Sequence, residues 1–196
     1  MVAWTGPLGD LDARALLAVY GGAHGAWGGP MVAATVVGAG WTALLLLPFL
    51  AWGRTRRFAS LLAVAVGAQA FLVWAIKLAV GRVRPWIALH LSAPPTAPAD
   101  PSFPSGHAAG SFCVAVFLAF ALPVAWKGTP HRARVVVALV GVLAVLVALS
   151  RVYLGAHFPS DVAAGALLGG GIGALAGRLY VRGHPSVGVE DAPKRG

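Results

Sequence analysis

Acidic residues are scarce in this sequence, which has six Asp and Glu against fifteen Lys and Arg in 196 residues. So few carboxylates leave little material for a cluster that could bind a divalent metal ion. The single cysteine, Cys113, excludes an internal disulfide and a cysteine metal cluster, and we expect it to be a packing residue. Charged residues make up 11% of the chain, against about 25% in a soluble domain. An ordinary soluble domain is therefore excluded.

Apolar residues are abundant instead, at 58% of the chain, and they gather in long runs. A helix that crosses a bilayer needs about 20 such residues. Five runs approach that length: Pro30–Trp52, Phe58–Ile76, residues 105–126, Val135–Leu149 and residues 159–180. The fourth run is short, so its helix is expected to continue past Ser150 and Arg151. The sequence predicts an all-α integral membrane bundle of about five transmembrane helices.

The first 27 residues differ from the rest because their apolar part, Ala15–Tyr20, is too short to span a membrane. We expect a short helix on the membrane surface, capped at its start by Asp10 or Asp12. The predicted organisation is an N-terminal lead over residues 1–27, a transmembrane core over 28–182 and a polar cytoplasmic tail over 183–196.

The basic residues lie in short clusters between apolar runs, which is typical of membrane-protein loops and not of a nucleic-acid surface. Ten of the fifteen fall in three segments that alternation of the spans puts on one side: Arg54, Arg56, Arg57, Lys127, Arg132, Arg134, Arg178, Arg182, Lys194 and Arg195. The positive-inside rule makes that side cytoplasmic. We therefore expect a multi-pass protein of the cell membrane with a cytoplasmic C-terminus and membrane lipids as neighbours.

Three polar segments reach the opposite, extracytoplasmic side: Lys77–Pro85, Pro104–His107 and Ser150–Asp161. Charges at a membrane boundary are costly and usually functional. A phosphoryl group under attack carries negative charge on three oxygens. We expect Lys77, Arg84 and Arg151 to neutralise that charge. The hydroxyl of Ser105 and the amide of Gly106, at a predicted helix start, would add hydrogen bonds to the same anion.

Two histidines and one aspartate in the same segments are candidates for the transfer of the phosphoryl group. We interpret His157 as the nucleophile and Asp161, one helical turn later, as the group that orients it. His107 is then the general acid that protonates the leaving oxygen. The mechanism needs no metal and no cofactor, because the cations supply the positive charge.

Three further polar residues stand close to these motifs. Arg82 lies inside the first motif, and we favour a headgroup or surface contact for it. His90 and Asp100 are interpreted as loop residues of the proline-rich segment Pro85–Pro104, although either could touch a substrate headgroup. This segment carries six prolines, so we expect it to be irregular.

The combined pattern is specific. It reads Lys77, six residues, Arg84-Pro85; then Pro104-Ser105-Gly106-His107; then Ser150-Arg151, five residues, His157, three residues, Asp161. It resembles the type 2 phosphatidic acid phosphatase family, which includes glucose-6-phosphatase and vanadium haloperoxidases. The resemblance implies a helical bundle, often of six spans in bacteria, and metal-independent hydrolysis through a phosphohistidine. It also implies that all eight predicted site residues occupy functional positions.

The sequence thus predicts a lipid phosphate phosphatase. Expected substrates are polyprenyl diphosphate, phosphatidate, phosphatidylglycerol phosphate or a prenylphosphoryl sugar phosphate. Two alternatives stay open: a phosphotransferase that passes the phosphate to an alcohol, and a non-catalytic protein that binds lipid headgroups.

Overall fold

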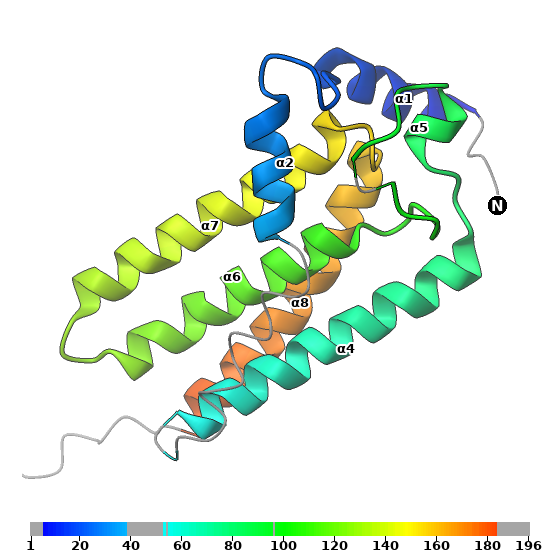
Figure 1. The fold of residues 1–196 in the computed structure, drawn as a ribbon. Helices are drawn as coiled ribbons and strands as arrows, with labels where there is room; N and C mark the ends of the chain where they lie inside the picture. Colours follow the sequence, from blue (N-terminus) through cyan, green and yellow to red (C-terminus); the bar gives the residue numbers. More distant parts are fainter. Residues whose placement is uncertain (1–5, 39–52, 54, 96, 184–196) are drawn as a thin grey trace, which may run out of the picture.

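The computed structural model describes residues 6–38, 53, 55–95 and 97–183. Over these residues the chain is helical and contains no strand, which confirms the all-α prediction. The helices are α1 (Pro7–Val19), α2 (Gly28–Val37), α4 (Arg56–Val80), α5 (Pro85–Ala88), α6 (Gly106–Ala125), α7 (Pro130–Tyr153) and α8 (Pro159–Arg182) (Figure 1).

Four helices of the described residues, α4, α6, α7 and α8, are long and apolar enough to cross a membrane. They correspond to four of the five predicted spans. As expected, α7 continues beyond its apolar run, so that Arg151 lies in its last turn. The remaining predicted span, Pro30–Trp52, begins within α2, but its residues 39–52 lie outside the described part of the chain. Arg54 and the predicted tail from residue 184 also lie outside it.

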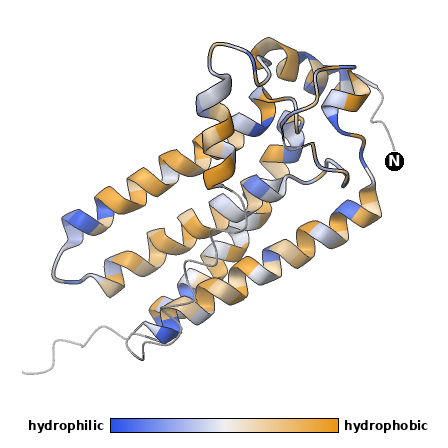
Figure 2. Cartoon of the chain, viewed as in Figure 1, coloured by the Kyte–Doolittle hydropathy of each residue, from blue (hydrophilic) through white to orange (hydrophobic). Residues whose placement is uncertain are grey.

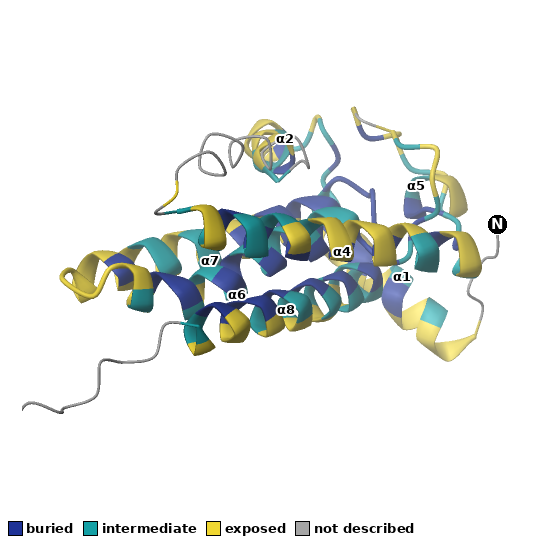
Figure 3. Cartoon of the chain, turned by 90° about the horizontal axis from the view of Figure 1, so that it is seen from below, coloured by how far each residue is buried: buried dark blue, intermediate teal, exposed yellow. Residues whose placement is uncertain are grey.

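The outer faces of these helices suit a lipid environment. Large apolar side chains point away from the bundle, among them Val64, Leu139 and Leu167, which are 68%, 64% and 78% exposed. Apolar residues run along the helices while polar residues gather towards their ends (Figure 2). Figure 3, coloured by burial, shows exposed residues along the outer faces of the helices. The bundle therefore presents a hydrophobic belt between two polar ends.

Small residues at spacing four allow α8 to lie directly against α6. A Cβ atom added at Gly165, Gly169 or Gly173 would come within 2.3, 1.9 or 2.3 Å of a backbone carbonyl oxygen of the facing segment. Only glycine permits so close a contact between two backbones.

The two ends of the bundle differ in character. The turn between α6 and α7 lies at the same end as the start of α4 and the end of α8 (Figure 1). There Arg57 donates hydrogen bonds to the carbonyls of Leu179, at 3.2 Å, and Gly183, at 2.8 Å. The opposite end holds α1, α5, the end of α7 and the start of α8, and it carries the predicted functional motifs.

Helix α1 lies across that functional end, and its cap prediction was wrong. The helix begins after Gly6, and no side chain in the described part of the chain caps it. Asp12 is instead buried, and it accepts hydrogen bonds from Arg82 and from the Ser160 amide, at 2.6 and 3.0 Å. The proline-rich segment Pro85–Pro104 was expected to be irregular, but it starts with the short helix α5.

We predict that Gly169→Ala destabilises the bundle because the new methyl group would meet the Ala109 carbonyl at 1.9 Å. The control is Gly171→Ala on the same helix, where no atom of the described residues lies within 4 Å of the new Cβ. Thermal unfolding in detergent should show a clearly lower midpoint for the first variant and an equal or higher midpoint for the second. Equal midpoints for both variants would contradict this packing.

Candidate active site

One backbone hydrogen bond and one hydrogen bond from a side chain to the backbone bring the three predicted motifs together. The amide of Ser105 donates to the carbonyl of Asp161 at 2.9 Å, which joins the second motif to the third. Arg84 donates through Nη1 to the carbonyl of Ala156 at 2.9 Å, which joins the first motif to the third. These contacts put side chains from the ends of α4, α6, α7 and α8 around one point.

The His157 ring has distinct partners on its two nitrogens. Its Nδ1 lies 3.6 Å from Oδ2 of Asp161, and its Nε2 lies 3.2 Å from Nη1 of Arg84. A guanidinium can only donate, so Nε2 acts as the acceptor in this contact. The hydrogen-bond network thereby assigns the ring proton to Nδ1, facing Asp161. The Nε2 lone pair is directed towards the cations.

A tight turn after α7 holds this imidazole in place. The carbonyl of Arg151 accepts hydrogen bonds from the amides of Ala156 and His157, at 3.0 and 3.1 Å. Gly155 supports the turn with a φ of 69°, a conformation that favours glycine. Burial, together with the charges of Arg84 and Arg151, lowers the pKa of His157 to about 3, although Asp161 acts in the opposite direction. The imidazole is therefore neutral at physiological pH.

The Asp161 carboxylate is fully buried and accepts several hydrogen bonds. Arg82 donates to Oδ1 at 2.5 Å, while Ser102 and the Phe158 amide donate to Oδ2 at 2.5 and 2.9 Å. Such donors offset the cost of burying a charge. The expected surface contact of Arg82 was wrong: the residue is 1% exposed and bridges Asp161 to Asp12.

Asp100 links two of the predicted phosphate-binding cations. Its Oδ2 lies 2.8 Å from Lys77 Nζ, and its Oδ1 lies 2.8 Å from Arg84 Nη2. Burial alone would raise the pKa of Asp100, but Lys77 and Arg84 outweigh that effect and lower the pKa. The interpretation as a plain loop residue therefore missed a contact with the first motif. The Asp100 side chain remains 49% exposed.

The remaining predicted residues lie on the helix ends around this point. Arg151 is 1% exposed and donates to Thr35 Oγ1 of α2 at 3.1 Å. Ser105 is the N-cap of α6, at the predicted helix start, and its hydroxyl accepts a hydrogen bond from the Ala108 amide at 3.5 Å. Gly106 and His107, in the first turn of α6, line a cavity together with Lys77 and Asp100.

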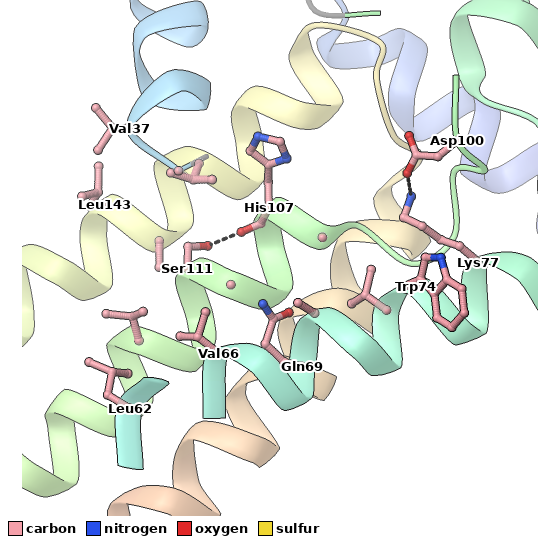
Figure 4. A pocket seen from close by; sticks show the side chains of 18 of the residues that line it. Val37, Leu62, Val66, Gln69, Trp74, Lys77, Asp100, His107, Ser111 and Leu143 are labelled. Carbon is pink, nitrogen blue, oxygen red and sulfur yellow. Dashed lines mark hydrogen bonds and ion pairs between the residues drawn. The ribbon is translucent and has the colours of Figure 1, made fainter. Parts of the chain in front are cut away.

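That cavity has a volume of about 740 Å³ and extends between α4, α6 and α7. Figure 4 shows the His107 and Lys77 side chains at one part of it and Leu62 and Val66 at another. Most of the lining away from the polar end is apolar: Leu62, Val66, Ala70, Val73, Val114, Val140, Leu143, Ala144 and Val147. A polar end joined to an apolar groove suits an amphiphile.

No group of three or more His, Cys, Asp or Glu side chains gathers as metal ligands within the described residues. Sequence reasoning missed Asp12, Ser102 and Ser160 as partners of the site. A signal existed for Asp12, since an acid is rare in this chain and should pair with a buried base. No comparable sequence signal pointed to Ser102 or Ser160.

Comparison with known proteins shows the family of this chain. Residues 58–184 match the PAP2 superfamily. The chain is 37% identical over 109 residues to phosphatidylglycerophosphatase B of Bacillus subtilis, which covers 56% of this chain and 51% of that protein. It is 35% identical over 143 residues to decaprenylphosphoryl-5-phosphoribose phosphatase of Mycobacterium tuberculosis, covering 69% of each. The chain thus spans about half the length of the first relative and about two thirds of the second.

Comparison with solved structures points to the same family. The crystal structure of a transmembrane PAP2 type phosphatidylglycerolphosphate phosphatase from Bacillus subtilis superposes with a TM-score of 0.75 and 25% identity, covering 94% of this chain and 90% of that one. The region of similarity contains all three motifs, and its relatives are named phosphatases. The chain belongs to the PAP2 superfamily and shares the fold of a solved transmembrane member.

Proposed function

We propose that this chain is a metal-independent lipid phosphate phosphatase that works through a phosphohistidine at His157. The observation that carries the proposal is the position of the His157 ring between Asp161 and Arg84. One nitrogen faces a carboxylate that can accept its proton. The other nitrogen keeps its lone pair on the side where the cations lie.

In the first step, Nε2 of His157 attacks the terminal phosphorus of the substrate. Asp161 stabilises the positive charge that develops on the imidazole. Lys77, Arg84 and Arg151 neutralise the three phosphoryl oxygens, and the hydroxyl of Ser105 and the amide of Gly106 add hydrogen bonds. The bond from phosphorus to the leaving oxygen breaks as the bond to nitrogen forms.

His107 acts on the opposite side of the phosphorus. It gives a proton to the leaving oxygen, so that a neutral alcohol, or the phosphate ester left from a diphosphate, departs. The same residue then takes a proton from water, which attacks the phosphohistidine and releases inorganic phosphate. His157 returns to its neutral form at the end of the cycle.

The groove between α4, α6 and α7 supports an amphiphilic substrate whose apolar part lies within the bundle. Polyprenyl diphosphate, phosphatidate and phosphatidylglycerol phosphate are the proposed substrate classes. The relatives named above act on phosphatidylglycerol phosphate and on a prenylphosphoryl sugar phosphate, which are lipid phosphates of the same general form.

We place the site at the extracytoplasmic face of the cell membrane. The supporting observation is charge: the described basic residues Arg56, Arg57, Lys127, Arg132, Arg134, Arg178 and Arg182 lie towards the end of the bundle opposite to the site. Short basic loops are retained in the cytoplasm, so the motifs and the α7–α8 connection face outwards. The C-terminus is then cytoplasmic.

Phosphate release by the purified protein should survive excess EDTA and be inhibited by vanadate. The cations of the site replace a metal, and vanadate adopts the five-coordinate geometry of phosphoryl transfer. The assay is release of inorganic phosphate from phosphatidylglycerol phosphate in detergent micelles. Complete loss of activity with EDTA, restored by magnesium, would refute the metal-free mechanism.

Substitutions of the two histidines should have different effects on the covalent intermediate. With ³²P-labelled substrate, His157→Ala should form no acid-labile, base-stable phosphoenzyme, and its kcat should fall at least about a thousandfold. His107→Ala should turn over slowly but still accumulate label, because the nucleophile is intact. Label retained in His157→Ala would show that another residue is the nucleophile.

Asp100→Asn should strengthen vanadate inhibition. Asp100 forms ion pairs with the Lys77 ammonium and the Arg84 guanidinium, at 2.8 Å each. An incoming oxyanion must compete with the Asp100 carboxylate for these two cations. Removing its charge should lower the inhibition constant by about two- to fivefold, the range expected for a partly exposed ion pair. Asp10→Asn, on the exposed face of α1, is the control. An unchanged or weaker inhibition in Asp100→Asn would contradict this competition.

A further inference from the structure

Gln69 is an unusual residue in the wall of the groove. It lies near the middle of α4 and is 5% exposed, and its amide oxygen has no hydrogen-bond partner among the described residues. A buried amide in a membrane-spanning helix is costly unless something satisfies it, and such residues commonly mark a ligand. Gln69 lines the same cavity as His107 and Lys77, and Figure 4 shows its side chain at that cavity.

The neighbouring polar side chain does not satisfy this amide. Ser111 lies across the cavity on α6, but its hydroxyl donates to the backbone carbonyls of His107 and Ala108, at 2.9 and 3.2 Å. Both contacts are within its own helix. The other side chains around Gln69 that line the groove are mainly apolar. Among the described residues the cavity offers no partner for this amide oxygen, and a group from the substrate can supply one.

The depth of Gln69 indicates which part of the substrate it would meet. It precedes Lys77 by eight residues, which is about 12 Å along a helix at 1.5 Å per residue. On the facing helix, its Nε2 lies 3.6 Å from the position of a Cβ on Gly110, which follows His107 by three residues. Gln69 thus lies about one helical turn beyond the proposed general acid, on the side of the leaving group.

A primary amide offers both a donor and an acceptor, and a hydroxyl group can use both. A plain hydrocarbon leaving group would leave the amide unpaired, and sites built to bind a hydroxyl discriminate against analogues without it. We propose that Gln69 hydrogen-bonds a hydroxyl of the leaving alcohol and selects lipid phosphates of polyols, such as glycerol or a pentose, over simple prenyl phosphates. The proposal rests on the proposed function and adds a specificity-determining residue to it.

The test uses two substrates that differ by one hydroxyl: a long-chain alkyl glycerol phosphate and its deoxy analogue without the secondary hydroxyl. The wild-type protein in detergent should show a kcat/KM at least about tenfold higher for the hydroxylated compound. Gln69→Leu should lose about tenfold on that compound and change by less than about threefold on the deoxy analogue. The two substrates should then be hydrolysed at similar rates.

Val64→Leu is the matched control, because it puts leucine on the same helix at a side chain that is 68% exposed. It should leave both kcat/KM values unchanged. Thermal unfolding provides a second readout: Gln69→Leu should be at least as stable as the wild type, since it removes a buried group without a partner. If Gln69 had a structural role, Gln69→Leu would instead have a lower midpoint of thermal unfolding than the wild type.

Each other outcome has a defined meaning. An equal loss on both substrates, or no loss on either, overturns the proposal while leaving the phosphatase assignment intact. If Gln69→Leu fails to fold, the wild-type protein alone decides, because equal rates on the two substrates also overturn it. Absence of phosphate release from both substrates, and from prenyl phosphates, would instead reject the proposed function itself.

Discussion

The buried carboxylate of Asp161 is the constraint on which the site depends. A charge buried inside a membrane bundle is tolerated only when donors surround it. Arg82 follows α4, Ser102 lies in the proline-rich segment, and the Phe158 amide begins α8. Because each donor comes from a different part of the chain, the carboxylate is satisfied only when all of these segments are in place. The Asp161 carboxylate is then held in a fixed orientation beside the His157 ring.

Close helix packing sets the spacing of this end of the bundle. Gly165 allows the first turns of α8 to contact the carbonyl of Ser105, and the Ser105 amide donates to the Asp161 carbonyl at 2.9 Å. The second and third motifs are therefore connected through backbone atoms and not through flexible side chains. A site built on rigid helix ends can hold its groups in a precise arrangement.

The positive charges have two effects at once. In the proposed mechanism Arg84 and Arg151 bind an oxyanion, and together with burial they also lower the pKa of His157. In many proteins a carboxylate next to a histidine raises the pKa of the imidazole, but here burial and the guanidinium groups outweigh Asp161. A cation cluster suited to phosphate thus also keeps the nearby imidazole unprotonated.

The sequence alone determined the class of fold and the identity of the motif residues. Long apolar runs predict helices, and a spacing of four residues puts His157 and Asp161 on adjacent turns, because both are local properties of the chain. The contacts of Asp12 with Arg82 and of Asp100 with Lys77 were decided only by tertiary structure. So was the burial of Gln69 in the groove. Such contacts join residues far apart in sequence, and they depend on how helices pack, which local periodicity does not specify.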